Sequence, residues 1–153
     1  MSLQQQAELL VPAAPERVRA VLLDPQAFAD WNPAFVSISG GTTATVGERY
    51  PITVRPGLSG TFAYTEISDL RIGTTWSVPG FREDGTWNLQ PRSSETLLTH
   101  RFEHTGPLAA LLERAYRGVA ALRLDRLADR VATRNLATPA RTTQKEHDSP
   151  ANC

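Results

Sequence analysis

The sequence has few of the residues and runs that mark several protein classes. Its single cysteine, Cys153, excludes an internal disulfide and is typical of a reducing compartment. Its 16 basic and 16 acidic side chains cancel, so no net charge favours nucleic acid. No segment approaches the roughly 18 consecutive apolar residues of a membrane-spanning helix, and MSLQQQAELL lacks the basic start and apolar run of a signal peptide. We therefore expect a cytoplasmic protein that has no membrane span and no nucleic-acid partner.

Metal-ligand spacing and cofactor motifs are also missing. The three histidines, His100, His104 and His147, are scattered along the chain, and His104 is expected to be solvated at the end of a strand. The sequence contains no glycine-rich phosphate loop, nucleophile elbow or paired-cysteine motif. We expect no metal and no cofactor.

Length and periodicity predict one domain over residues 1–136, followed by a tail. A chain of 153 residues suits a single hydrophobic core. The segment 137–153 has no apolar periodicity and contains two prolines, so it is expected to be disordered.

The first hundred residues predict strands, interrupted once by helices. Residues 4–11 form the first strand, and Pro15 and Gln26 each begin a short helix. From Phe35 the apolar residues recur at every second position, with turn signals every 8 to 12 residues. This pattern predicts six further strands in one antiparallel meander.

The stretch from Pro107 to Leu136 predicts one long helix. Its apolar residues recur at three- and four-residue steps and form a stripe: Leu108, Leu111, Leu112, Ala115, Val119 and Leu122. Its arginines are interpreted as a solvated outer face: Arg114, Arg117, Arg123, Arg126, Arg130 and Arg134. A helix of about 45 Å is expected to lie across the curved sheet.

This order of elements resembles the START-like helix-grip (SRPBCC) superfamily, in its polyketide cyclase/dehydrase branch. The matching stretches are residues 14–18, Asp24-Pro25, Trp31-Asn32-Pro33 and Thr99-His100-Arg101, followed by the helix start at Gly106-Pro107. The resemblance implies an α+β helix-grip fold: a curved antiparallel sheet of about seven strands around a long C-terminal helix, with two short helices after the first strand. It also implies a pocket between sheet and helix for lipids, steroids, hormones or polyketides. Aromatic cyclases of this superfamily use an arginine in that pocket, but neither Arg55 nor Arg82 matches its position.

Aromatic residues on the predicted inner face are the candidates for ligand contact, because they offer large flat apolar surfaces. The alternative is that they only fill the core. The candidates are Trp31, Phe35, Tyr50, Phe62, Trp76, Trp87, Phe102 and Tyr116.

Three residues are candidates for proton transfer. His100 alternates with Leu98 and Phe102 and is expected to face inward, either as an acid or base or as a core histidine. Tyr64 and Glu66 are expected to share a face, where burial would raise the pKa of the carboxyl. The alternative is a one-residue slip in register that turns both side chains outward and leaves Glu66 as a solvated strand charge.

We therefore predict a protein that binds a hydrophobic small molecule between sheet and helix, and whether it also catalyses as a polyketide-type cyclase or dehydratase is left open. A non-catalytic carrier or sensor and a partner-binding regulatory module are the alternatives. The sequence leaves the ligand's identity and a homodimer open.

Overall fold

The computed structural model describes residues 3–137. Its elements run in the order β1 (Leu3–Val11), α1 (Pro15–Leu22), η1 (Pro25–Ala27), α2 (Phe28–Trp31), β2 (Phe35–Ile38), β3 (Tyr50–Val54), β4 (Leu58–Ile67), β5 (Arg71–Val78), β6 (Phe81–Arg92), β7 (Glu95–Thr105), α3 (Ala109–Leu112) and α4 (Val119–Ala137). Most of the predicted tail, from residue 138 on, lies outside the described residues.

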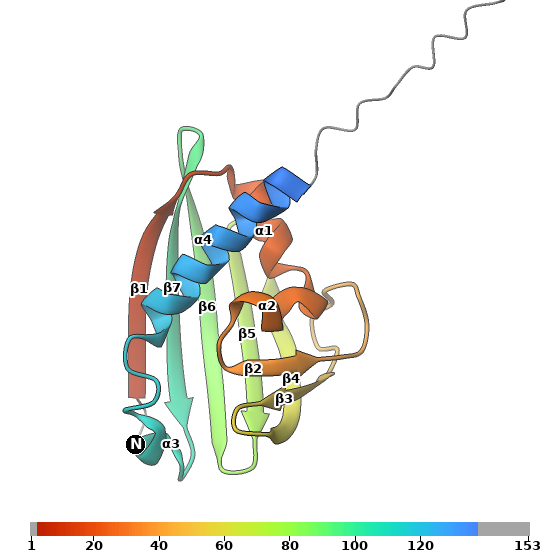
Figure 1. Cartoon of the computed structure of the whole chain (residues 1–153), viewed down its shortest axis with the longest axis vertical. Coiled ribbons are helices and arrows are strands. Elements are labelled where there is room, and N and C mark those ends of the chain that lie inside the picture. The colour runs from red at the N-terminus through yellow and green to blue at the C-terminus, as the bar shows by residue number, and fades with distance from the viewer. Residues whose placement is uncertain (1–2, 138–153) are drawn as a thin grey trace, which may run out of the picture.

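The seven strands form one antiparallel sheet in the order β1-β7-β6-β5-β4-β3-β2. The first strand pairs with the last. The sheet is curled, and α4 crosses its concave face diagonally (Figure 1). Alternation of buried and exposed residues is clear in β6 and β7, as expected for strands with one face on the core. The helix-grip fold predicted from the sequence is confirmed.

The predicted helix from Pro107 to Leu136 is not continuous. Only Ala109–Leu112 and Val119–Ala137 are helical, and residues 113–118 form turns between them. Gly118 has φ of +75°, a conformation that other residues adopt only under strain. The apolar repeat continues across the break, and this is why periodicity alone predicted one helix.

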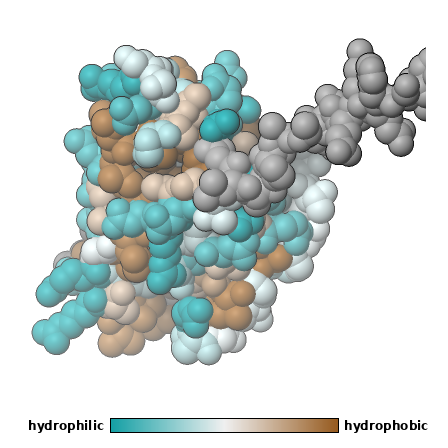
Figure 2. Space-filling model, turned by 45° about the horizontal axis from the view of Figure 1, so that its top comes forward, coloured by the Kyte–Doolittle hydropathy of each residue, from teal (hydrophilic) through white to brown (hydrophobic). Residues whose placement is uncertain are grey.

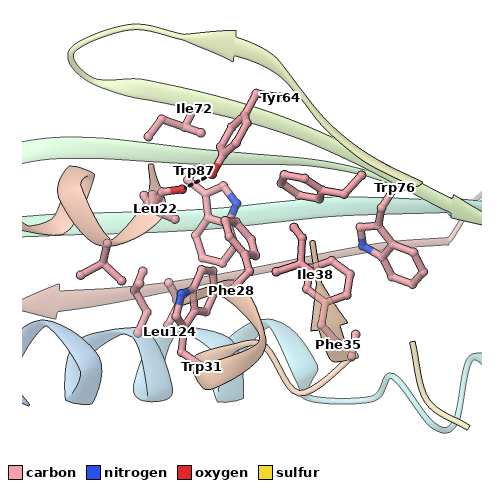
Figure 3. Close-up of a cluster of buried hydrophobic side chains, with 14 of the residues drawn as sticks. Leu22, Phe28, Trp31, Phe35, Ile38, Tyr64, Ile72, Trp76, Trp87 and Leu124 are labelled. Atoms are coloured by element: carbon pink, nitrogen blue, oxygen red, sulfur yellow. Dashed lines mark hydrogen bonds between the residues drawn. The ribbon is translucent and has the colours of Figure 1, made fainter. Parts of the chain in front are cut away.

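The interior beneath α4 is filled by aromatic side chains from the α2 segment and the sheet. Figure 3 shows Phe28 and Trp31 reaching from α2 toward Trp87 of β6, with Leu124 of α4 beside Trp31. The rings of Trp31 and Trp87 meet edge to face, with 5.3 Å between centroids. This cluster is the main core of the domain.

Within the described residues, no helix is long and apolar enough to cross a membrane.

Candidate functional site

An apolar pocket of about 480 Å³ opens between the sheet and the chain that leads into α4. We call it the apolar pocket, and its main walls are Trp76, Val78, Phe81, Leu112, Tyr116 and Val119. On the side of β2 and β3 it is closed by the Pro33-Ala34 turn and by residues 54–56 and 58. The break between α3 and α4 shapes this pocket, because Ala115 and Tyr116 lie in the turns.

A second pocket of about 440 Å³ lies between the edge strand β1 and the start of α4. We call it the edge pocket; its lining includes Gln4, Gln6, Phe102, His104, Tyr116 and Arg117. It is more polar than the apolar pocket. Tyr116 lines both pockets.

A buried ion pair lies directly behind the walls of these pockets. Arg123 of α4 is fully buried and donates from Nη1 and Nη2 to the two carboxylate oxygens of Glu83 on β6, each at 2.9 Å. The carboxylate also accepts from Trp76 Nε1 at 2.9 Å and from His104 Nε2 at 2.8 Å. Glu83 is therefore paired on both oxygens, as a buried charge requires.

The electrostatics of Glu83 follow from this pairing. Burial by itself raises the pKa of the Glu83 carboxyl, but the charge of Arg123 and the hydrogen bonds from His104 and Arg123 outweigh burial. The net effect holds its pKa well below the usual range. Glu83 is thus ionised, and His104 must be the donor in their hydrogen bond.

His100 is buried and held as a neutral imidazole. Its Nδ1 donates to the carbonyl of Thr86 at 3.0 Å, and Nε2 accepts from Arg123 Nη1 at 3.1 Å, because a carbonyl can only accept and a guanidinium can only donate. Burial and the charge of Arg123 lower its pKa to about 3. Its ring stacks on Trp87 with 3.5 Å between centroids. Both nitrogens of His100 are therefore engaged within the protein.

The other two predicted catalytic residues lie away from the pockets. Tyr64 is buried, as predicted, but its hydroxyl donates to the carbonyl of Leu22 at 2.7 Å (Figure 3). Burial raises the pKa of Tyr64 well above its usual range. The prediction that Glu66 shares a face with Tyr64 is wrong, because a bulge between them shifts the alternation by one residue. Glu66 is about half exposed and pairs with Arg71 at 2.8 Å.

The predicted ligand-binding aromatics divide into residues that line a pocket and residues that belong to the core. Trp76 and Tyr116 line the apolar pocket, while Phe102 and Tyr116 line the edge pocket. The others are core residues in contact with one another or with neighbouring rings: Trp31, Phe35, Tyr50, Phe62 and Trp87.

Sequence reasoning missed the centre of the polar network. Arg123 was assigned to a solvated face and His104 to a solvated strand end, yet their exposed fractions are 0% and 2%. Glu83, which lies near the start of β6, was not among the predicted site residues. The signals were present: Glu83 alternates with Phe81 and Trp87, and Arg123 is in step with Leu127 on the buried face of α4.

Comparisons with known proteins agree with this geometry. The family model described as "Polyketide cyclase / dehydrase and lipid transport" matches residues 4–132. No protein of curated function matches the chain.

Solved structures share the fold at low sequence identity. The Zhui aromatase/cyclase from Streptomyces sp. R1128 has 14% identity and a TM-score of 0.74, over 88% of this chain and 96% of that one. A START superfamily protein from Mycobacterium smegmatis has 15% identity and a TM-score of 0.70, over 85% and 97%. Norcoclaurine synthase from Thalictrum flavum, solved as a point mutant with a transition-state analogue, has 17% identity and a TM-score of 0.67, over 88% and 97%.

Proposed function

We propose, from the premise that this chain belongs to the polyketide cyclase/dehydrase and lipid transport family, that it binds a hydrophobic small molecule in the apolar pocket. The observation that carries the proposal is the pocket itself: about 480 Å³ of space walled mainly by aromatic and aliphatic side chains, with Arg55 also in its lining. Pockets of this size and lining are typical small-molecule sites. The family description names polyketides and lipids, which are ligands of this chemistry.

The geometry favours binding over catalysis by the residues that the sequence predicted. A proton-transfer group needs a free lone pair or proton within reach of the ligand. The polar atoms of His100 and Tyr64 are engaged inside the protein, and Glu66 faces solvent. A carrier or sensor of an apolar ligand is therefore the function that the site supports best.

Filling the pocket tests this function. Ala115 is exposed and lines the pocket, so Ala115→Trp places an indole in the space without disturbing the core. We expect the affinity for the fluorescent probe 1-anilinonaphthalene-8-sulfonate to fall at least about tenfold, because the ligand's apolar contacts are lost. The matched control is Ala132→Trp on the exposed side of α4, which should bind as the wild type does. Equal binding by both variants would place the probe elsewhere and overturn the proposal.

A cyclase or dehydratase activity is the second candidate, and His104 is the observation that favours it. Its Nε2 is fixed by the Glu83 carboxylate, and no described residue hydrogen-bonds its Nδ1. His104 is among the residues that line the edge pocket, so Nδ1 is the nitrogen left to accept a proton from a small ligand there. Ring closure of a polyketide begins with loss of a proton next to a carbonyl, which a held imidazole can accept. The aromatase/cyclase among the structural neighbours shares this fold.

Deuterium exchange at the central carbon of benzoylacetone tests that candidate without knowledge of the natural substrate. The wild type should accelerate exchange over buffer, and His104→Asn should lose the acceleration while its circular dichroism stays native. His100→Asn is the control, because both nitrogens of His100 point into the protein. Exchange at the buffer rate with the wild type would rule out catalysis of this kind.

The partner-binding alternative has less support. The exposed large apolar residues are distributed over different elements, and on the face shown in Figure 2 hydrophobic patches alternate with hydrophilic ones. They are Leu10, Val36, Val46, Leu58, Leu70, Leu111 and Leu122. A homodimer, a cytoplasmic location and the absence of a metal stay predictions.

A further inference from the structure

Tyr116 occupies the boundary between the two pockets. It is the only residue that both pockets share among the walls named above, and it belongs to the turns that separate α3 from α4. On one side lies the apolar pocket of about 480 Å³, and on the other the edge pocket of about 440 Å³. Its side chain therefore forms part of the wall between the two spaces, together with Phe81 of the apolar pocket and His104 of the edge pocket, whose ring centroids are 4.6 Å apart.

The backbone of Tyr116 is fixed from two directions. Its carbonyl accepts a hydrogen bond from Nε2 of Gln5 on β1 and another from the amide of Val119 at 3.1 Å. Its own amide donates to the carbonyl of Leu112 at 3.1 Å. These hydrogen bonds fix the position of the Tyr116 backbone, and therefore the place where its side chain begins.

The ring of Tyr116 is held by other rings. It stacks on Phe81 with 5.4 Å between centroids and meets His104 edge to face at 4.6 Å. No described residue hydrogen-bonds its hydroxyl in this structure. Because the ring is held only by contacts with other rings, phenylalanine can replace Tyr116 without opening a connection between the two pockets.

Several described wall residues close to Tyr116 in the chain are too small to take the place of this ring. The neighbouring wall residues Ala115, Ala120 and Ala121 are small, and a Cβ added at Gly118 would meet no atom within 4 Å. Truncating Tyr116 therefore leaves space beside the Phe81 and His104 rings that these alanines are too short to fill.

We propose that Tyr116 is a specificity-determining residue whose ring closes the apolar pocket off from the edge pocket and so sets the length of apolar ligand that the protein accepts. The inference rests on the proposed binding function and adds the ligand class: compact apolar molecules, not extended chains. Extended ligands are excluded by the ring, although both pockets together would hold them.

A homologous series of 1-alkanols from hexanol to tetradecanol tests this, by displacement of 1-anilinonaphthalene-8-sulfonate from the full chain. Affinity should rise about fourfold with each buried methylene until the pocket is full, and then level off. In Tyr116→Ala the rise should continue for at least two further methylenes, so the longest alcohols bind at least about tenfold more tightly than to the wild type. Their hydroxyl ends then reach the polar lining of the edge pocket.

Two variants keep the result interpretable. Tyr116→Phe retains the ring and should level off at the wild-type length. Leu111→Ala removes a side chain that is 76% exposed and lines neither pocket, so it too should match the wild type. If Tyr116→Ala itself is unfolded by circular dichroism, Tyr116→Leu replaces it, because it also lacks the ring.

The outcomes separate this inference from the proposed function. If Tyr116→Ala levels off at the wild-type length while Ala115→Trp still weakens binding, the partition is refuted and the binding function stands. If Ala115→Trp leaves binding unchanged as well, the binding function itself is refuted.

Discussion

Glu83 and Arg123 form an ion pair whose side chains are almost completely shielded from solvent, with exposed fractions of 3% and 0%. Such a pair adds little net stability when it is complete, but loss of one partner leaves a buried charge without compensation. Arg123→Leu leaves the buried Glu83 carboxylate without its positively charged partner. We expect the free energy of unfolding to fall by about 3–5 kcal/mol, measured by urea denaturation.

The double variant Glu83→Leu/Arg123→Leu is the matched control. Because it removes both charges, it should be more stable than Arg123→Leu alone. The free energy of unfolding that it loses should be smaller than the sum of the losses of the two single variants. A single variant that loses less than about 1 kcal/mol would show that the pair is not buried as described.

His100 makes a separate prediction about acid stability. Its pKa is about 3 in the folded protein, lowered by burial and by Arg123, while in the unfolded chain it is close to 6.5. Between these values the unfolded chain binds the extra proton, so stability falls as the pH drops from about 6.5 toward 3.

Urea denaturation at pH 7 and pH 5 measures this effect. We expect the wild type to lose about 2 kcal/mol more between these pH values than His100→Asn, which has no titrating ring. Identical losses would mean that His100 titrates normally in the folded protein.

At the scale of the elements, Gly118 is the last residue of the turns that separate α3 from α4. Its φ of +75° suits glycine, and a Cβ there meets no other atom, so a substitution changes only the backbone energy. Gly118→Ala should reduce stability by about 1 kcal/mol, and Gly118→Asn by less, since asparagine tolerates this conformation better. Thermal unfolding of the two variants measures the difference. A stabilising Gly118→Ala would instead support the uninterrupted helix that the apolar repeat predicted.

The predicted and observed elements show what the sequence can and cannot predict at this scale. Apolar periodicity correctly predicted the strands and the C-terminal helical segment, because each element buries one face and therefore has apolar residues at regular spacing. The break at Gly118 and the bulge after Tyr64 depend on backbone geometry that leaves the apolar pattern unchanged. The bulge had a direct consequence, since it turned Glu66 outward.

For the whole molecule, the fold could be predicted from the order of elements, but the pairing of Glu83 with Arg123 could not. Glu83 and Arg123 are 40 residues apart in the chain, and the periodicity that places each on a buried face does not show that the two meet. Only the crossing of α4 over β6 and β7 brings them together (Figure 1). The pocket was expected along the sheet and helix, yet the aromatic core fills the interior beneath α4 and leaves the apolar pocket near α3.

The three tryptophans offer the most direct test of where a ligand binds. Only Trp76 lines the apolar pocket, whereas Trp31 and Trp87 belong to the core beneath α4. A ¹H–¹⁵N spectrum of the labelled protein reports one indole N–H signal for each tryptophan, and single Trp→Phe variants assign the signals. We expect titration with an apolar ligand such as 1-octanol to shift the Trp76 signal saturably and to leave the other two unchanged. Shifts confined to Trp31 and Trp87, or no shift at Trp76, would contradict binding in the apolar pocket.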